Sequence, residues 1–496
     1  MPDILFGNIL GGVSYTFLPY ALPQYFMADS QNILPILTGY AAQRGGSEKL
    51  NSGDRYGTLI TSFHELVVSG VSYKFAAQGT KVGRFANVKF SDHITGLTDG
   101  YYGQWINYGD YAIYANGVDT VRKTDGTTPS ALTAHLAGLP GGNCLNEWGE
   151  RVWVSVGNTL YGSALRAPTD FNTTTTDSGY WEGTIGSANQ DITGLVSFFD
   201  MQLIGKLNQI WQLTGAPETA SSTFRLTPLQ TKDRDSLGFT SKNGIVQVGN
   251  DLLFLDGYTI KALSGIQAYG DVESISIVGN LKDFLLDSSG AGIDKAYLQY
   301  SDFFHYKKKE QVYCSIPTGA TTRYWFVIDY SNQDIRKALG LPKYSFFPMS
   351  GLHPTCFGGV ENGSVMDIYA GCNDGFVRKL DTGYDDTTTP VSSYATWCYG
   401  NATRMVQPIS VILSVRGETG MTMIPYYAMG LQDWQNIRTA SNYTALDTEV
   451  FGGEAWRVNN KTGYKKINSF YMNTDKSFTF KIAHNNTGEG FEMRDS

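Results

Sequence analysis

Hydrophobic and polar residues alternate most regularly in the run Arg151–Val156, where three valines are separated by Trp153 and Ser155. The next pair, Gly157-Asn158, supplies the positive φ that a tight turn needs, and Leu160-Tyr161 begins a return strand. This pattern predicts a two-stranded antiparallel hairpin. Because a lone hairpin is only marginally stable in water, it must belong to a larger sheet.

Similar patterns recur at intervals of about 40 to 60 residues, which is the spacing of four-stranded blades in a β-propeller. Each has an apolar strand, a short turn rich in Gly, Asn or Asp, and a second strand. The seven hairpins span Glu65–Phe75, Tyr111–Val118, Arg151–Tyr161, Gln202–Gly215, Asp251–Lys261, Gln311–Asp329 and Met366–Leu380. We therefore predict an all-β chain with a β-propeller of six or seven blades over residues 51–389, because radially stacked blades cover both faces of each sheet. A pair of β-sandwiches with unrelated hairpins is the alternative.

The two ends of the chain have different patterns. Residues 1–50 lack sustained periodicity, and the prolines of the apolar segment Phe17–Pro23 keep it from being helical. We expect an extended N-terminal arm that packs on neighbouring subunits or on an adaptor above, and not inside its own propeller. A polar stretch that ends at Pro390 marks a second boundary, and alternation resumes at Ile409–Val415 and Phe478–Ile482. These patterns predict a small antiparallel β-domain over residues 390–496.

Composition adds a constraint on the surface. The 496 residues are 17% charged, against about 25% in typical proteins, so Thr, Ser, Asn, Gln and Tyr must supply much of the polar surface. Such surfaces suit protein interfaces. The net charge of −8 argues against a protein that grips nucleic acid, since that requires a basic face. The N-terminus has an acid where a signal peptide needs basic residues, and no apolar run approaches a membrane span, so we expect assembly in cytoplasm and no membrane partner.

Motifs that would indicate catalysis or metal binding are missing from the sequence. The chain has no nucleophile elbow, phosphate-binding loop, dinucleotide fingerprint, zinc-protease motif or EF-hand loop. Its five cysteines are dispersed, with no C-x-x-C, and are predicted to be buried thiols. Its six histidines are far apart. We therefore predict no catalytic residue, no metal site and no cofactor.

Two charged features leave alternatives open. The carboxylate pairs Asp233/Asp235 and Asp385/Asp386 are candidates for a glycosidase site, which needs two acids, although solvated loops or interface ion pairs are the more common role of such pairs. The basic run Lys307–Lys309 follows Phe303, Phe304 and Tyr306 and is a candidate nucleic-acid contact. We favour the alternative that this run is a solvated edge that blocks stray strand pairing.

The order of hydrophobic and turn segments resembles the β-propeller tail proteins of short-tailed bacteriophages, the nozzle or head-completion proteins that plug the portal. The resemblance covers about residues 15–385 and includes no catalytic residue. Its matching pieces are Asn32, Ala42–Gly46, Arg151–Val156, Leu160–Ala164, Pro168–Phe171, Ile192–Phe199, Gln209–Gly215, Asp235–Gly238 and Val246–Gly257. The C-terminal domain does not match.

This resemblance implies a virion protein in a ring, usually sixfold, that retains packaged DNA and conducts it during ejection. The implied partners are other copies of the chain, a portal or adaptor above, tail fibre or needle proteins nearby, and genomic DNA that passes without specific binding. The negative charge fits such a channel, since a wall that repels phosphate lets DNA slide. The alternatives are a glycan-binding or polysaccharide-degrading propeller and a cellular scaffold propeller.

Overall fold

The structure is a computed structural model of the chain. It describes residues 8–15, 22–23, 25–36, 39–172, 180–215, 223–229, 237–265, 272–276, 285, 291–362 and 365–400, together with strands between residues 410 and 493. Within these residues the chain is almost entirely β-structure, and its one described α-helix of more than one residue is α2 (Gln333–Ala338). Short 3-10 turns cover Leu136–Gly138, Lys295–Tyr300 and Lys307–Lys309.

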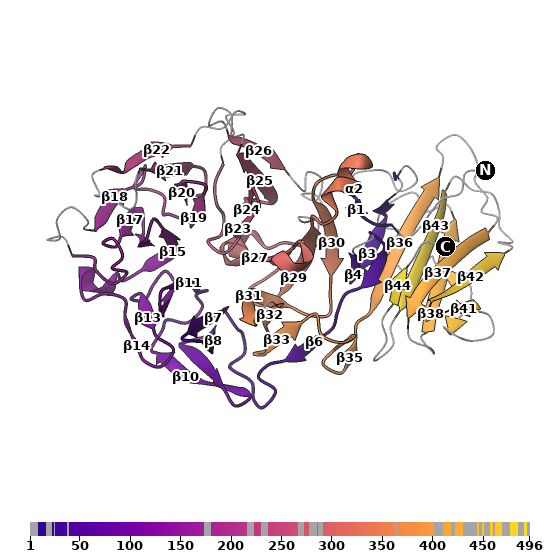
Figure 1. The fold of residues 1–496 in the computed structure, drawn as a ribbon, viewed down its shortest axis with the longest axis horizontal. Helices are drawn as coiled ribbons and strands as arrows, with labels where there is room; N and C mark the ends of the chain where they lie inside the picture. The colour runs from indigo at the N-terminus through magenta and orange to yellow at the C-terminus, as the bar shows by residue number, and fades with distance from the viewer. Residues whose placement is uncertain are drawn as a thin grey trace.

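The chain folds as a β-propeller whose blades are arranged radially in Figure 1. In the described residues, each of the first six blades is a four-stranded antiparallel sheet in which chain order equals spatial order. The first three blades contain β7 (Ser62–Val68), β8 (Val71–Gln78), β9 (Lys81–Ala86) and β10 (Lys89–Thr95); β11 (Gln104–Tyr108), β12 (Tyr111–Ala115), β13 (Arg122–Thr124) and β14 (Pro129–Ala131); and β15 (Gly142–Trp148), β16 (Arg151–Val156), β17 (Thr159–Gly162) and β18 (Trp181–Thr184).

Blades four to six repeat this plan. They contain β19 (Gly194–Phe198), β20 (Met201–Gly205), β21 (Ile210–Thr214) and β22 (Arg225–Pro228); β23 (Ile245–Val248), β24 (Asp251–Asp256), β25 (Thr259–Gly265) and β26 (Val272–Ser276); and β27 (Asp302–Tyr306), β28 (Gln311–Pro317), β29 (Arg323–Asp329) and β30 (Ser345–Met349). The first strand of each blade is the one nearest the propeller axis (Figure 1). In blade six the second strand is buried on both faces, since every residue of β28 is buried.

The seventh blade joins the two ends of the propeller. It contains β31 (Pro354–Asn362), β32 (Val365–Cys372) and β33 (Val377–Leu380), and its fourth strand is β6 (Ser47–Lys49), which comes before the first blade in the chain. Ser47 pairs with Leu380 and Lys49 with Arg378 in antiparallel register. Two short strands, β34 (Asp385–Asp386) and β35 (Thr389–Pro390), extend the sheet. Hydrogen bonds between residues from both ends therefore close the ring, and the predicted range of six or seven blades resolves to seven.

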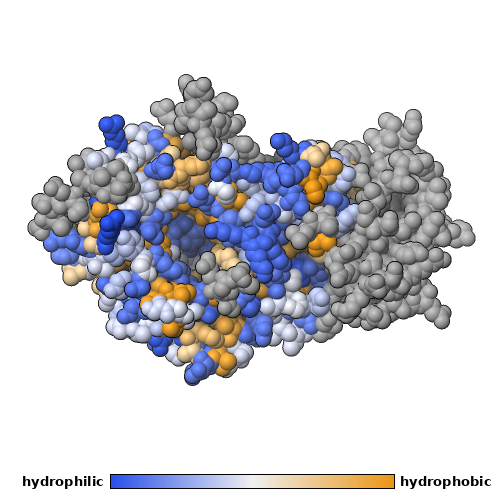
Figure 2. Space-filling view, viewed as in Figure 1, coloured by the Kyte–Doolittle hydropathy of each residue, from blue (hydrophilic) through white to orange (hydrophobic). Residues whose placement is uncertain are grey.

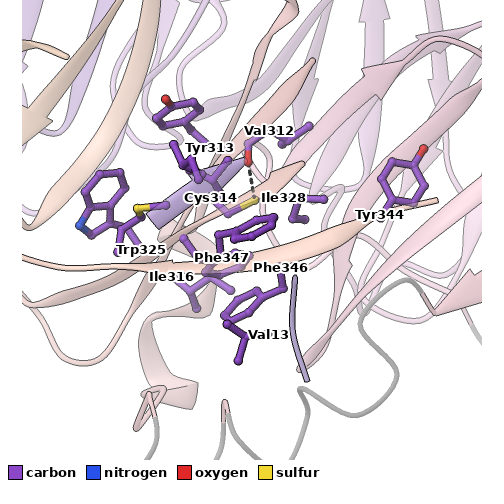
Figure 3. Close-up of a cluster of buried hydrophobic side chains, with 14 of the residues drawn as sticks. Val13, Val312, Tyr313, Cys314, Ile316, Trp325, Ile328, Tyr344, Phe346 and Phe347 are labelled. Carbon is purple, nitrogen blue, oxygen red and sulfur yellow. Dashed lines mark hydrogen bonds between the residues drawn. The ribbon is translucent and has the colours of Figure 1, made fainter. Parts of the chain in front are cut away.

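The described part of the N-terminal arm packs on its own chain, so the expectation that the arm does not pack inside its own propeller is wrong, whereas its contact with neighbouring subunits stays a prediction. Besides β6, it contains β1 (Gly12–Val13), β2 (Phe26–Met27), β3 (Asp29–Gln31), β4 (Ile33–Pro35) and β5 (Ala41–Gln43). Val13 lies in the same buried cluster as Phe346 and Phe347 of β30 (Figure 3). Of the segment Phe17–Pro23, on which the expectation rested, residues 17–21 lie outside the described part. The described arm packs inward because its strands find hydrogen-bonding partners there.

The C-terminal strands form antiparallel sheets that include strands of the arm. β3 pairs with β36, and β5 pairs with β44, so β3 and β4 lie between the propeller and the C-terminal strands in Figure 1. The C-terminal strands are β36 (Ser393–Gly400), β37 (Ser410–Gly417), β38 (Thr422–Met429), β39 (Thr444–Ala445), β40 (Glu449–Val450), β41 (Arg457–Asn459), β42 (Thr462–Asn468), β43 (Ser477–His484) and β44 (Phe491–Met493). The predicted antiparallel domain is thus completed by residues from the other end of the chain.

Candidate functional site

A cavity of about 560 Å³ lies on the propeller axis. Its walls come from the innermost strands β7, β11, β23, β27 and β31, joined by Lys242 and Asn243 from the segment that precedes β23. Figure 2 shows a hollow at the centre of the propeller face. The cavity exists because the first strands of the blades surround the axis without meeting on it.

One end of the cavity is crossed by hydrogen bonds. The Asn243 side chain donates to the Gly103 carbonyl at 3.1 Å, and the Asn243 carbonyl accepts from the Phe303 amide at 2.9 Å. Lys242 donates from Nζ to the carbonyl and Oδ1 of Asn143, at 3.2 and 3.0 Å. These residues connect blades two, three, five and six across the axis. All lie close to the N-terminal ends of the innermost strands.

The opposite end is the mouth of the cavity. Val67 and Gly109 line this end, close to the turns where β7 and β11 lead into the second strands of their blades. Both are exposed, Val67 to 48% of its full surface. A small molecule can therefore enter from this side, whereas the hydrogen bonds of Asn243 and Lys242 obstruct the other side.

Lys242 is the one Lys or Arg among the described residues that line the cavity. Its side chain is partly accessible. Burial lowers the pKa of its ammonium group from 10.5 to about 8. Among the described residues, no carboxylate lies within 4.0 Å of its Nζ, and both acceptors of its hydrogen bonds belong to Asn143.

Asp302 is the cavity's unusual acid. Burial raises the pKa of its carboxyl group from 3.8 to about 8, against the smaller effects of the Phe357 amide and the Arg323 guanidinium. The Phe357 amide donates to Oδ1 at 3.1 Å. Asp302 is therefore mostly protonated at neutral pH and can donate a hydrogen bond. The nearby Cys356 is also in its neutral form, because burial raises the pKa of the thiol well above its usual value, and it is a poor nucleophile.

His64 and Glu65 complete the titratable groups of the wall. Burial lowers the pKa of His64 to about 4, and its Nε2 lies 2.7 Å from Oδ1 of Asn107, so the ring is neutral at pH 7. The ring stacks on Trp105, with centroids 5.2 Å apart. Glu65 accepts a hydrogen bond from Ser72 and lies 4.0 Å from Lys74.

The carboxylate pair Asp385/Asp386 singled out in the sequence does not line this cavity. Asp386 binds Arg44, and the Asp385 backbone packs against Gly46, where a Cβ would meet the Asp385 carbonyl oxygen at 2.1 Å. Asp233 and Asp235 lie outside the described residues. Lys242 and Asp302 were missed because each is flanked by ordinary polar and aromatic residues, and only the closure of the ring brings them to one cavity.

The basic run also has a different place from the one predicted. Lys307–Lys309 forms the tight turn between β27 and β28, the innermost and second strands of blade six, and not an outer edge. Lys309 donates to Oδ1 of Asp381 at 2.6 Å. The run is exposed, and its position at a turn explains its charge, because a turn on the surface is solvated.

Three further histidines have separate partners. His93 lies 2.7 Å from the Thr124 hydroxyl, His305 2.5 Å from the Tyr330 hydroxyl, and His353 3.0 Å from the Arg323 carbonyl. In the described part of the chain, no three His, Cys, Asp or Glu residues are grouped as metal ligands would be. No described helix is long and apolar enough to cross a membrane.

A second polar cluster joins the arm to the rest of the chain. Asn32 donates to the Ser392 carbonyl at 2.7 Å and to the Ser350 hydroxyl at 3.1 Å, and its Oδ1 accepts from Arg44 at 2.9 Å. Arg44 also donates to the Ser350 carbonyl and to both oxygens of Asp386. We call Asn32, Arg44, Ser350, Asp386 and Ser392 the junction cluster. It connects the arm, blade six, the end of the propeller and the start of β36.

Comparisons with known proteins agree on the architecture only. No family model matches the chain, and no curated protein matches it. Among solved structures, the β-propeller domain of Cps50 (Swd1) from Myceliophteria thermophila is 10% identical, with a TM-score of 0.40, over 69% of this chain and 99% of that one. A chain of the mitotic checkpoint complex is 13% identical, with a TM-score of 0.41, over 69% and 95%. The N-terminal domain of Nup159 is 10% identical, with a TM-score of 0.37, over 71% and 94%. Similarities this low carry no argument about function.

Proposed function

We propose that this chain is a structural subunit of the tail of a short-tailed bacteriophage. Six copies form a ring below the portal or adaptor, and the ring retains packaged DNA and conducts it during ejection. The chain has no catalytic activity in this role. Its other partners are neighbouring tail proteins, such as fibres or a needle.

The junction cluster is the observation that carries the proposal. Asn32 and Arg44 belong to the segments that resemble phage tail proteins, and both are buried where the arm, the propeller and the C-terminal strands meet. Other matching segments, such as Arg151–Val156, lie in blade interiors. The resemblance therefore falls on residues that hold an architecture together, as expected for a structural protein. An enzyme family would instead share residues that line a cavity.

The axial cavity bears on where DNA would pass. Hydrogen bonds of Asn243 and Lys242 cross it, and about 560 Å³ is far too small for a duplex. In the proposed ring, DNA passes through the centre of the assembly, and the propellers form its wall. The charge of −8 on each copy makes that wall net acidic, which favours sliding over gripping.

The oligomeric mass of the purified chain, alone and with a portal or adaptor protein, tests the proposal. A closed ring of six copies, seen by native mass spectrometry and electron microscopy, is the expected result. A monomer that remains monomeric with those partners would overturn it. Cleavage or specific binding of a polysaccharide by that monomer would favour the glycan-directed alternative.

Duplex DNA binding as a function of salt tests the channel mechanism separately. We expect weak binding at physiological salt, because an acidic wall displaces few counterions. Tight binding with a steep salt dependence would mean that the wall grips DNA, and the sliding mechanism would then be wrong even if the ring forms.

A further inference from the structure

We propose that the axial cavity is a binding site for a small organic monocarboxylate, whose charged group binds Lys242 and whose apolar body lies against the aromatic wall. This inference is independent of the proposed phage role. It rests on the cavity, on its single unbalanced charge and on the side chains around it.

The size and the opening of the cavity suit a small ligand. About 560 Å³ falls within the usual range for ligand pockets, roughly 300–1,000 Å³. The cavity is accessible from the end lined by Val67 and Gly109 and obstructed at the end crossed by Asn243. The cavity is therefore a pocket that is open at one end and closed at the other, and the closed end is called its floor.

The floor provides the charge that the ligand must match. An ammonium group has three N–H donors, and Lys242 donates to two acceptors of one residue, Asn143. A cation taken out of water without a counter-charge is costly. No carboxylate of the described chain compensates Lys242, so a carboxylate from outside would provide both the missing acceptor and the missing charge.

The other titratable groups decide the charge of the ligand. His64 is neutral at pH 7 because its pKa is about 4, and Asp302 is mostly protonated because its pKa is about 8. Glu65 is engaged by Ser72 and lies near Lys74. The cavity thus presents one positive charge, which matches a monoanion better than a phosphate dianion. The protonated Asp302 adds a donor, since its described hydrogen bond is the one that Oδ1 accepts from Phe357.

The remaining wall combines apolar side chains with polar groups, several of which already have hydrogen-bond partners. Phe304, Ile245 and Met366 line it together with Trp105. The Asn243 side-chain amide already donates to the Gly103 carbonyl, and the Gln104 side-chain oxygen accepts from the Leu145 backbone amide at 2.7 Å. Few polar groups are therefore left to recognise a hydroxylated body, and an aromatic carboxylate fits the wall better than a sugar acid does.

The test uses 4-fluorobenzoate as the probe and 4-fluorobenzamide as its neutral control, with binding to the full-length protein followed by ¹⁹F NMR. The two molecules have nearly the same shape, so the comparison isolates the charge without any change in the protein. We expect fluorobenzoate to bind at least about tenfold more tightly, the difference made by a charge-assisted hydrogen bond. Equal binding of the two probes, or no binding of fluorobenzoate at about 10 mM, would overturn the proposal.

Two variants locate the site. Lys242→Met removes the charge, and Lys308→Met removes the same charge from the exposed turn between β27 and β28. Fluorobenzoate affinity should fall about tenfold in the first variant and stay unchanged in the second, once thermal melting has shown that both are folded. Unchanged binding by a folded Lys242→Met protein would show that the probe binds elsewhere, and the assignment of the cavity would then be wrong.

Discussion

Arg44 donates two hydrogen bonds to the carboxylate of Asp386, from Nη1 to Oδ1 at 3.1 Å and from Nη2 to Oδ2 at 2.5 Å. The pair is almost fully buried, with 4% and 9% of the two side chains exposed. It ties the N-terminal arm to the residues that follow the last blade. Since removing one member of a buried ion pair leaves an uncompensated charge, this contact should be far more sensitive than a surface ion pair.

Arg44→Met should lower the free energy of unfolding by about 3–5 kcal/mol, the usual cost of breaking a buried pair. Denaturant unfolding would measure this change. As the matched control, Lys81→Met breaks the exposed pair with Asp92, whose side chains are 41% and 44% exposed, and should cost less than about 1 kcal/mol. Equal effects of the two substitutions would contradict the role given to the junction cluster. The double variant Arg44→Met/Asp386→Asn should lose less than the sum of the single losses.

Truncation of the arm should affect the folding of the propeller itself. A chain that begins at residue 8 keeps every described strand, whereas a chain that begins at residue 51 lacks β1 to β6 and leaves β33 as an open edge of the seventh blade. The shorter chain should therefore melt at a lower temperature or aggregate, because open β-edges associate. Circular dichroism melting and light scattering would compare the two. A stable, monomeric propeller from residue 51 would show that strand β6 is dispensable.

The sequence predicts the individual hairpins better than it predicts how the propeller ring closes. The turn at Gly157-Asn158 is found where expected, with Gly157 at φ 57° and Val156 paired with Thr159. In the second blade, the pair Asn116-Gly117 lies instead in the longer link between β12 and β13, and the tight turn is at Gly109-Asp110. Local patterns predict which neighbouring strands pair, because the residues that come into contact are close together in the chain.

Contacts between distant residues leave no such pattern. The three residues of β6 are too few to show an alternation, and nothing in their identity indicates that they complete the sheet of β33. The junction cluster and the cavity were missed for the same reason. Arg44 meets Asp386, and Lys242 meets Asn143, only after the ring has closed. A sequence of one protein contains no information on such pairs beyond the residue types themselves.

Asp302 should make stability depend on pH. Its pKa is raised from 3.8 to about 8 in the folded chain, so the folded state binds more protons than the unfolded state between these values. Its contribution is therefore complete at low pH and is lost as the pH rises toward 8. Asp302→Asn cannot titrate, so the stability of the wild-type chain relative to the variant should fall between pH 5 and pH 7, by at most about 1.4 kcal/mol per pH unit.

Denaturant unfolding of the wild-type chain and Asp302→Asn at several pH values would measure this difference. His64 acts in the opposite direction, because its pKa is lowered to about 4 and stability rises with pH from about 4 to 6.5. Its effect is common to both proteins and cancels in the comparison. A difference that stays constant with pH would mean that Asp302 is ionised in the folded chain.

The five cysteines should be unreactive in the folded protein. Cys144, Cys314, Cys356, Cys372 and Cys398 are all buried, and burial raises the pKa of Cys144 to about 11 and that of Cys372 to about 12. Because the thiolate is the reactive form, a thiol reagent such as Ellman's should label none of them rapidly at pH 8 and all five after denaturation. Rapid labelling of one cysteine in the native state would show that its site opens.

The pairing of Ser47 with Leu380 also determines when the propeller can finish folding during protein synthesis. The N-terminal residues leave the ribosome first, yet the strand that receives them is translated only after six blades have emerged. Until then β6 has no partner, and β3 and β5 wait still longer for the C-terminal strands. Individual blades can form on the nascent chain, but closure brings together ends that are far apart and is expected to be the slow step. A chain whose translation stops before the seventh blade would remain an open arc of sheets, exposed to aggregation and to proteases.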